Sequence, residues 1–491
     1  MSDQTHETSS NQGLTATLNL PRLIFIGLAY FSLAPAIYLN MGFMETDANG
    51  PVMPFLFIVI TIAVLPTAIS FAVLSNRRPS AGSGYTWLSE FVHRGVGLWT
   101  GAVMILAYVF VCSIYAPAFG LFFNAFLSAI GVNGSEWTGI AGGLVMVVVA
   151  GFVARGDVKT GAMVIGLLMV LEAGFVAVLA VIIVVKGGTL GHFSAVPFKP
   201  SEAGAGLNGL ALAAVFAFLS IAAVDSIAPV AEESHTPKRL IPLATILITI
   251  GAGAYWALTS YAFAIAVPVQ TVAHYVDAGQ LTPVYPIAKQ YIGGWAVLVP
   301  ITGFTAALAS YGASLYAASR LMYAVSRQGF LPRYLSRVER RHGAPWNAEL
   351  TVLGVSTTLF LLGVLWQGSI AGAYGYLAEV FVFFVLIMYL LVNVANFVYH
   401  RRWPAEAHWF MTGVVPVVGI VIDAYILYRG FFVAELALPF RTGSSVVWLS
   451  LGLAVAGAAW AWWNLRRSTP HTQQVVDSAF EPARPPADEH S

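Results

Sequence analysis

The chain has 491 residues, of which 58% are apolar and only 10% are charged, and its formal net charge is +1. Soluble proteins carry about 25% charged residues, so this composition excludes a soluble enzyme and a nucleic-acid binder and predicts a protein whose partner is the lipid bilayer. The single cysteine, Cys112, excludes an intrachain disulfide and a thiolate zinc site.

Apolar stretches recur along almost the whole chain. A transmembrane helix needs about 20 mostly apolar residues, and twelve stretches approach or exceed that length. We place them at about residues 21–47, 52–74, 96–128, 137–154, 160–185, 206–232, 243–267, 295–324, 348–366, 371–398, 409–430 and 444–465. Their long apolar runs favour helices over the short alternating strands of a membrane barrel.

The positive charges are distributed unevenly between the predicted loops. With the N-terminus inside, 18 of the 24 Lys and Arg residues lie in cytoplasmic segments and five in outer loops. Because Lys and Arg concentrate in cytoplasmic loops, we expect a multi-pass protein of the cell's inner (plasma) membrane with both termini in the cytoplasm. Residues 1–20 and 468–491 are polar or proline-rich, and we predict that they form disordered tails.

Two of the predicted spans are interrupted, and they occupy matching places. The first contains Ser32–Ala36, where Pro35 lacks a backbone donor and disfavours helix for the preceding residue. The sixth contains Ser220–Ser226, followed by Pro229. Unpaired backbone groups at mid-membrane are tolerated where they line a cavity, so paired breaks in two inverted halves indicate the central site of a transporter. An ordinary proline kink is the alternative for either break alone.

Four segments in this order carry family motifs. Tyr30–Ala36 contains the pattern S-x-A-P-A, and Pro79–Tyr85 is similar to P-x-A-G-G-x-Y. Phe218–Pro242 is similar to an F-x-G-F-[ED] core followed by E-E-x-x-x-P-[KR]-x-[IL]-P, and Ser319–Pro332 to S-R-x-x-x-A-x-x-R-D-G-x-L-P. Together they resemble the amino acid–polyamine–organocation superfamily over about residues 20–465.

The resemblance implies an all-α polytopic membrane protein with twelve transmembrane helices. Its LeuT-type fold would comprise two inverted repeats of five helices, residues 21–200 and 201–403, with helices 1 and 6 discontinuous, and two peripheral helices in residues 404–467. It also implies alternating access, with the first, second, sixth and seventh spans moving against the third, fourth, eighth and ninth. Transport would be proton-coupled or by exchange, driven by a proton gradient without a cofactor or metal.

The implied substrates are small molecules, amino acids or amines. An amino acid would place its carboxylate at N–H groups after Pro35 and its ammonium at the carbonyls of Ile221–Ala223. A polyamine or other amine would instead need Asp225 or Glu172 as a counter-ion. We favour the amino acid, because two helix breaks suit a zwitterion. The residues expected at the substrate are Ser32, Leu33, Ala34, Pro35, Ala36, Tyr108, Ser113, Phe218, Ile221, Ala222, Ala223 and Asp225.

This sequence departs from the family's amino acid permeases at both breaks. Alanine flanks Pro35 where those permeases have a glycine-rich G-S-G, and Ala223 and Val224 replace the glycine and the aromatic residue of the sixth span. Each added methyl group narrows the approach to the backbone.

Ionisable residues within spans are functional candidates by default. Glu172 stands alone among apolar residues of the fifth span, near the position of a lysine linked to proton coupling in relatives, so we predict a proton-coupling role; a structural carboxyl is the alternative. Asp225 could bind an ammonium, sense the gate or cap a half-helix. We expect Glu379 and Asp423 to be structural and Arg320 to snorkel or to pair with an acidic residue of an inner gate.

Further pocket walls are expected from the third and eighth spans. The polar candidates are Tyr108, Cys112, Ser113 and Tyr115, and Ser310, Tyr311 and Ser314. The aromatic candidates are Tyr30, Phe216 and Phe218, for which plain packing is the alternative. Glu232 and Glu233 could form a surface gate or an ordinary solvated loop.

Other function classes fit less well. The ten histidines lie outside the predicted spans or at their ends, and no grouping of nucleophile and base is visible, which argues against a membrane enzyme. A channel would need a filter motif or rings of charge, and neither is visible. A nutrient-sensing receptor with a transporter fold remains an alternative.

Overall fold

The computed structural model describes residues 18–31, 33–154, 158–228, 230–277, 283–339 and 344–467. Within these ranges the protein is helical, and the only extended pairings are two isolated bridges, Leu18 with Ser234 and Gly188 with Gly191. The predicted disordered tails lie almost entirely outside the described residues, as do Ser32 and Pro229 of the predicted breaks.

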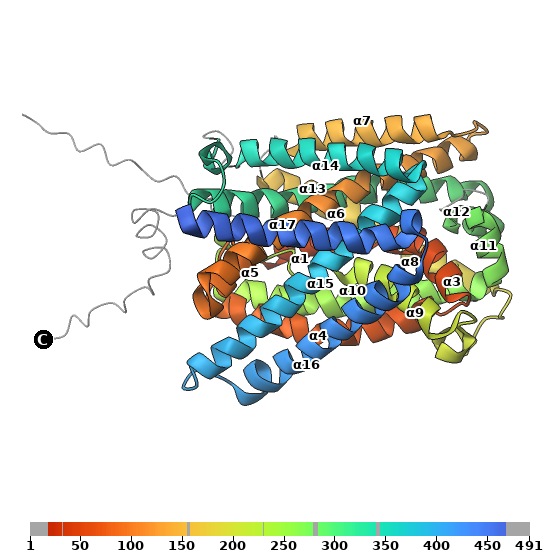
Figure 1. Cartoon of the computed structure of the whole chain (residues 1–491). Coiled ribbons are helices and arrows are strands. Elements are labelled where there is room, and N and C mark those ends of the chain that lie inside the picture. Colours follow the sequence, from red (N-terminus) through yellow and green to blue (C-terminus); the bar gives the residue numbers. More distant parts are fainter. Residues whose placement is uncertain are drawn as a thin grey trace, which may run out of the picture.

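The helices are arranged as one long bundle (Figure 1). The α-helices are α1 (Leu20–Tyr30), α2 (Pro35–Tyr38), α3 (Asn40–Ala48), α4 (Met53–Arg77), α5 (Gly84–Trp87), α6 (Arg94–Ala129), α7 (Glu136–Ala154), α8 (Val158–Lys186), α9 (Gly206–Ile221), α10 (Pro237–Ala266), α11 (Val269–Asp277), α12 (Val284–Ile292), α13 (Leu298–Arg327), α14 (Trp346–Gln367), α15 (Ile370–Arg402), α16 (Val415–Leu427) and α17 (Ser445–Arg467). Short 3-10 and π-helical turns join several of them. Two of these 3-10 turns, Ala231–Glu233 and Glu435–Ala437, contain acidic residues that are discussed below.

Ten helical segments of the described chain are long and apolar enough to cross a membrane. They include α4, α6, α10, α14 and α15, each at least 22 residues long. Two shorter apolar helices, Glu136–Phe152 and Gly206–Ile221, coincide with the predicted fourth and sixth spans. The structure therefore confirms an all-helical, multi-span protein, while the twelve-span arrangement in two inverted repeats stays a prediction.

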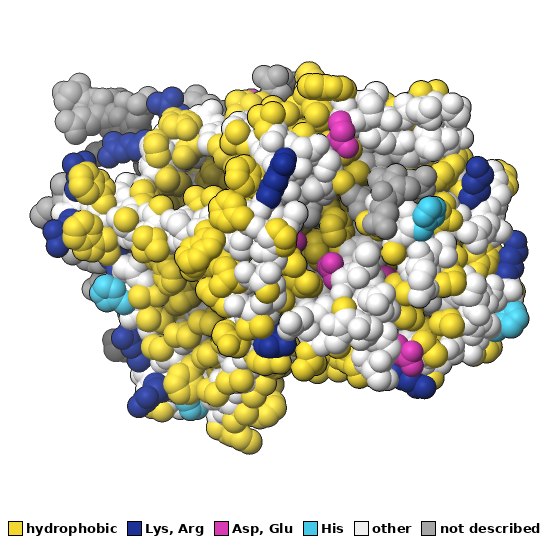
Figure 2. Space-filling view, turned by 45° about the vertical axis from the view of Figure 1, so that its right-hand side comes forward, with side chains coloured by type: hydrophobic (Ala, Val, Ile, Leu, Met, Phe, Trp, Pro, Cys, Tyr) yellow, Lys and Arg dark blue, Asp and Glu magenta, His cyan; other side chains and the backbone are white. Residues whose placement is uncertain are grey.

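The outer surface carries large apolar side chains whose exposure to water would be unfavourable. Trp137, Leu365, Leu258 and Phe152 are each more than 70% exposed. Figure 2 shows hydrophobic side chains over broad stretches of one face, with most of its Lys and Arg side chains toward the two ends of the molecule. A surface of this kind is suited to lipid contact along its length and to water at its ends.

Two long helices, α6 and α15, form the buried centre of the bundle. They pack against each other, and α6 also contacts α7 and α13. Glycine allows the close approach of α6 and α7, because a Cβ atom at Gly120 would lie 2.3 Å from the carbonyl oxygen of Gly139. Such small-residue contacts are the usual way for membrane helices to pack tightly. The α6–α15 pair provides a wall beside the interrupted helices.

The first predicted break is present. Helix α1 ends at Tyr30 and α2 begins at Pro35, so the chain leaves the helix over the intervening residues. Side chains of other helices satisfy its carbonyl groups: Trp256 Nε1 donates to the Leu33 carbonyl at 3.1 Å, and Ser310 Oγ donates to the Ala29 carbonyl at 2.8 Å. Irregular backbone at this depth is therefore compensated by tertiary hydrogen bonds.

The second break is also present, but it is longer than the sequence predicts. Helix α9 ends at Ile221, and the chain then runs in turns until the short 3-10 turn Ala231–Glu233 and the start of α10 at Pro237. Within the described residues no half-helix follows Asp225 directly, so the interrupted sixth span is an α-helix only as far as Ile221. The local cause is visible in the backbone bonds, because the Ala223 N–H turns back to the Ile221 carbonyl at 2.7 Å.

Candidate functional site

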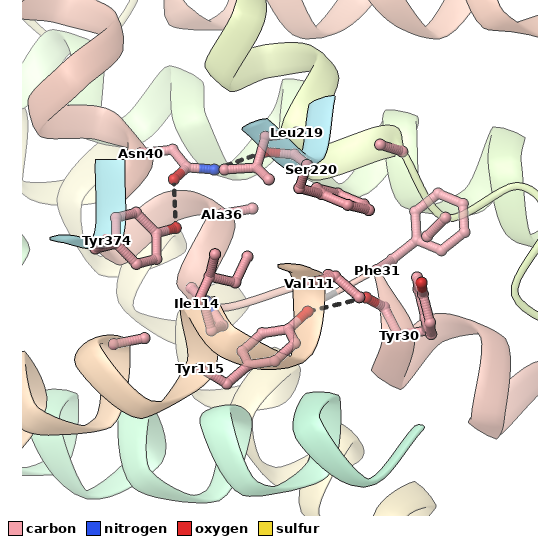
Figure 3. Close-up of a pocket in the computed structure, with 15 residues that line it drawn as sticks. Tyr30, Phe31, Ala36, Asn40, Val111, Ile114, Tyr115, Leu219, Ser220 and Tyr374 are labelled. Carbon is pink, nitrogen blue, oxygen red and sulfur yellow. Dashed lines mark hydrogen bonds between the residues drawn. The ribbon is translucent and has the colours of Figure 1, made fainter. Parts of the chain in front are cut away.

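A cavity lies where the two breaks face α6 and α15. It is narrow in this structure, with a cavity volume of about 20 Å³, room for roughly one water molecule. Its lining residues are Tyr30, Phe31, Pro35, Ala36, Asn40, Val111, Ile114, Tyr115, Ala118, Leu219, Ser220, Ala222, Ala223, Tyr374 and Phe381. Figure 3 shows them converging from four parts of the chain that are far apart in sequence.

A hydrogen-bonded polar group borders the cavity beside Ala36 (Figure 3). Asn40 Nδ2 donates to Ser220 Oγ at 3.0 Å, and Asn40 Oδ1 accepts from the Tyr374 hydroxyl at 2.8 Å. Ser220 in turn donates to the Phe216 carbonyl at 3.1 Å. These bonds join the second half of the first broken helix to α9 and α15, so they connect the two broken helices to each other and to α15.

Stacked aromatic rings continue this contact away from the cavity. The rings of Phe43 and Phe216 are stacked with centroids 4.4 Å apart, and Phe43 also stacks on Tyr374 at 6.0 Å. Rings packed face to face over the Asn40 group restrict access to the cavity from the α3 end of the bundle. We call Asn40, Phe43, Phe216, Ser220 and Tyr374 the α3-side closure.

Asp225 is buried next to the cavity but does not line it. One carboxylate oxygen accepts the hydroxyl of Tyr108, and the other accepts the hydroxyl of Tyr389 at 3.4 Å. Tyr389 also accepts the Val224 N–H at 3.1 Å. Asp225 therefore links the second break to α6 and α15. The sequence left open a capping role for Asp225, but no helix begins next to Asp225 among the described residues.

Glu172 lies on α8 beside the first break. Its side chain is fully buried, and neither carboxylate oxygen has a hydrogen-bond partner of good geometry. The Ala34 backbone amide is close enough to interact with the carboxylate, and so are the hydroxyls of Tyr38 and Tyr255. The predicted coupling residue is thus placed directly behind the broken helix, although it is not part of the cavity wall.

The structure brings together only part of the predicted substrate set. Pro35, Ala36, Ala222 and Ala223 line the cavity, whereas Leu33, Ala34, Ser113, Phe218 and Ile221 are buried around it without lining it. Tyr108 reaches the site through Asp225. Ser32 lies outside the described residues.

The expected wall from the eighth span is replaced by α15. The side chains of Ser310, Tyr311 and Ser314 on α13 do not line the cavity; Ser310 bonds the backbone of α1, and Tyr311 pairs with Ser356 at 3.0 Å. Tyr374 and Phe381 of α15 line it instead.

Sequence reasoning missed Asn40 and Tyr374 of the site and Tyr389 behind it. Asn40 could have been noticed as a polar residue five positions after Pro35, whereas a tyrosine in a membrane span gives no such signal.

A buried ion cluster lies at the opposite end of the breaks. Arg320 Nε contacts Glu233 Oε1 at 2.9 Å, and Arg320 Nη1 contacts Glu349 Oε1 at 2.8 Å. All three side chains are almost completely buried, and the Tyr316 ring lies 4.8 Å from the guanidinium carbon. Arg320 therefore pairs with acidic residues, which is one of the two alternatives that the sequence left open. The side chain of Glu232 lies outside the described residues.

The start of α1 is fastened to the same cluster. The Leu18 N–H donates to the Glu233 carbonyl at 2.8 Å, and the His235 N–H donates to the Leu18 carbonyl at 3.1 Å. The backbone of the segment after the second break thus binds the chain just before α1. The Glu233 side chain of the same segment binds Arg320 of α13, which also binds Glu349 of α14. We call Leu18, Glu233, Arg320 and Glu349 the α1-side closure.

Asp423 and Glu379 lie away from the cavity. Asp423 Oδ2 accepts from Asn393 Nδ2 at 2.9 Å and from Thr67 Oγ1 at 3.1 Å, which joins α16 to α15 and α4. Glu379 is buried on α15, near the carboxyl groups of Glu435 and Asp47. The position of Asp423 supports the structural role expected for it.

Two interrupted helices with a cavity at their breaks, within a bundle of long apolar helices, define a class of protein: a multi-pass helical membrane protein. Comparison with known proteins makes this more specific. The family model described as amino acid permease matches residues 18–465, and the chain belongs to this family. The resemblance found in the sequence motifs is thereby confirmed.

Curated relatives of the chain are transporters, not enzymes. It is 26% identical over 381 residues to the vacuolar cationic amino acid transporter 2 of Arabidopsis thaliana, covering 74% of this chain and 58% of that protein. It is 23% identical to a branched-chain amino acid permease of Bacillus subtilis, covering 91% and 94% of the two chains. It is 25% identical to a low-affinity putrescine importer of Escherichia coli, covering 68% and 72%. The chain thus spans less than two thirds of the plant transporter.

Proposed function

We propose that this protein is a secondary active transporter that moves amino acids across the cytoplasmic membrane by alternating access, with both termini inside and a proton gradient as the driving force. The observation that carries the proposal is the cavity formed where two interrupted helices meet. The relatives, two of which are named for amino acid transport, support the substrate class.

The substrate's polar ends fit the two breaks. Pro35 has no N–H, and the N–H groups of Ile37 and Tyr38 donate to the Ala34 carbonyl. The N–H of Ala36, at the cavity wall and the start of α2, is therefore the group proposed to meet a carboxylate. The carbonyls of Ile221 and Ala223 each accept one backbone hydrogen bond, at 2.7 and 3.0 Å, so each retains a lone pair for an ammonium. A zwitterion would therefore be bound largely by main-chain groups.

The two closures supply the gates of the proposed cycle. With the N-terminus inside, the α3-side closure faces the outside and the α1-side closure faces the cytoplasm. Both are formed here, which is the arrangement of an occluded state. Opening to the cytoplasm would separate Leu18 from the segment after the second break and Glu233 from Arg320. In the proposed LeuT-type arrangement, the first, second, sixth and seventh spans, which include both broken helices, move against the third, fourth, eighth and ninth.

Proton coupling is assigned to Glu172. Its carboxylate is buried, has no good hydrogen-bond partner and lies beside the Ala34 amide at the first break. A proton taken up there changes the charge next to the moving helix, so protonation and the position of that helix are linked.

Uptake into proteoliposomes tests the proposal. Purified full-length protein should concentrate a labelled neutral amino acid when the lumen is more alkaline than the bath, and a protonophore should abolish the accumulation. Binding of amino acids without any uptake or exchange would instead support a nutrient-sensing receptor. Accumulation of putrescine but of no amino acid would support an amine transporter, the function of the putrescine importer among the relatives.

A further inference from the structure

The cavity contains no charged side chain. None of its fifteen lining residues is Asp, Glu, Lys, Arg or His. The acidic group next to it, Asp225, already accepts hydroxyls of Tyr108 and Tyr389 on its two oxygens. Glu172 interacts with the Ala34 amide behind the broken helix. A substrate in the cavity therefore meets no free counter-ion.

Three polar side chains of the wall, Asn40, Ser220 and Tyr374, are engaged with one another, whereas the Tyr30 hydroxyl has no hydrogen-bond partner. The amide of Asn40 gives its hydrogen bonds to Ser220 and to the Phe216 carbonyl, and its oxygen accepts from Tyr374. A guanidinium or a second ammonium would have to break these bonds or stay unpaired, and an unpaired buried charge is costly. Apart from the uncharged Tyr30 hydroxyl, the surfaces left for a substrate side chain are apolar, namely Val111, Ile114, Leu219 and Phe381.

We propose, on the basis of the transport function above, that the substrate is an amino acid with a neutral, apolar side chain, and that the site discriminates against cationic amino acids and polyamines by lacking a counter-charge. The main-chain groups of the breaks bind the ammonium and the carboxylate, which every amino acid shares. Selectivity comes from the apolar wall, where each buried methylene group raises affinity by about fourfold.

Two matched ligand pairs test this inference with the purified wild-type protein. Lysine and 2-aminoheptanoic acid differ only in a terminal ammonium against a methyl group, and arginine and citrulline differ in side-chain charge at nearly the same shape. We expect the neutral member to bind at least about 30-fold more tightly in the first pair, and the neutral member to be preferred in the second. Leucine and valine should bind best, as measured by ligand-induced thermal stabilisation and by competition with labelled leucine uptake.

A counter-charge placed in the wall should change the preference. Ile114→Asp should narrow the ratio between 2-aminoheptanoic acid and lysine by at least 10-fold, whereas the matched neutral variant Ile114→Asn should leave the ratio close to that of the wild type. If neither variant yields folded protein, the wild-type ligand pairs still decide the question.

The outcomes separate this inference from the proposed function. Lysine or arginine binding as tightly as its neutral partner would overturn the neutral-substrate inference and leave amino acid transport standing. Putrescine binding with no amino acid binding would overturn the choice of amino acids as substrates. Binding of neither amines nor amino acids would overturn the transport proposal together with this inference.

Discussion

Two carboxyl groups flank the broken helices, and their surroundings differ. Asp225 is fixed by two tyrosine hydroxyls from α6 and α15. Glu172 has no good partner for either oxygen and faces a backbone amide of the first break. A group held by several hydrogen bonds positions the backbone around it, while a group without them can exchange a proton with little rearrangement of its neighbours. We therefore expect the two residues to respond differently to neutralisation.

Glu172→Gln should abolish proton-driven accumulation but preserve substrate exchange. Glutamine keeps the size and polarity of the side chain and removes its titration, so the broken helix can still move while the link to the proton is lost. The first measurement is substrate uptake into proteoliposomes with and without an imposed proton gradient. The second is the exchange of labelled for unlabelled substrate at equal concentrations on the two sides of the membrane.

Glu379→Gln is the matched control for that variant. Glu379 is also a buried glutamate, but it lies on α15 outside the cavity wall, so accumulation should persist. If Glu172→Gln vesicles still concentrate substrate under the gradient, the proton is carried elsewhere.

Asp225→Asn should lower substrate affinity only modestly, by less than about 10-fold, or roughly 1.4 kcal/mol. The asparagine oxygen can still accept one tyrosine hydroxyl, and the side chain does not line the cavity. Tyr108→Phe, which removes one of the two donors, should have an effect of similar size. Isothermal binding measurements give the comparison; a loss of 30-fold or more in Asp225→Asn would identify a direct ion pair with the substrate ammonium.

The interrupted helices show how much of the site the sequence could predict. Pro35 and the polar run after Ser220 act on their own neighbours in the chain, so both breaks could be predicted from local chemistry. The contact between Asn40 and Tyr374 joins residues 334 positions apart and depends on how α3 meets α15, which no local pattern encodes. The same limit explains why α15, not the eighth span, provides the second wall.

The length of the second break also depends on tertiary contacts. Val224 and Asp225 are held by Tyr389 of α15, which competes with continued helix. A half-helix after Asp225 was therefore a reasonable prediction from sequence, and the structure replaces it with turns. Recognition of the family was easier, because four motifs in order require no knowledge of packing.

Ala36→Leu should weaken substrate binding strongly while leaving the yield of folded protein nearly unchanged. Ala36 lines the cavity at the start of α2, so three additional carbon atoms would occupy the space of the ligand and screen the backbone amides. The measurement is affinity by thermal stabilisation, with folded yield followed by size-exclusion chromatography.

Ala141→Leu is the control for added volume. Ala141 is exposed on α7, where a larger apolar side chain extends toward lipid. Binding there should match the wild type. Unchanged affinity in Ala36→Leu would place the substrate outside this cavity.

At the scale of the whole molecule, three distant segments depend on one guanidinium. Arg320 on α13 forms ion pairs with Glu349 at the start of α14 and with Glu233 after the second break. The backbone of Glu233 in turn hydrogen-bonds to Leu18, just before α1. The moving and fixed parts of the proposed cycle thus meet at a single buried cluster. Its loss should affect the stability of the whole fold and not only the gate.

Arg320→Met should destabilise the protein by about 3–5 kcal/mol, because it leaves two buried carboxylates without a counter-charge. Adding Glu233→Gln and Glu349→Gln should recover much of that loss. The control is Arg77→Met, whose partner Glu406 and own side chain are 56% and 39% exposed, so a change of at most about 1 kcal/mol is expected. Denaturant or thermal unfolding in detergent gives the comparison; equal effects of the two variants would contradict a stabilising role for the buried cluster.

The depth of the Arg320 cluster has a consequence for the environments in which the protein can work. Dissolved ions weaken interactions between exposed charges, with a screening length of about 10 Å at 0.1 M salt, but they screen buried pairs far less. The exposed Arg77–Glu406 pair should weaken as the cytoplasm becomes more saline, while the contacts of Arg320 keep their strength. The balance between closed and open forms in the proposed cycle should therefore be almost independent of ionic strength. Osmotic stress that concentrates the cell's salts should leave the strength of the Arg320 contacts nearly unchanged.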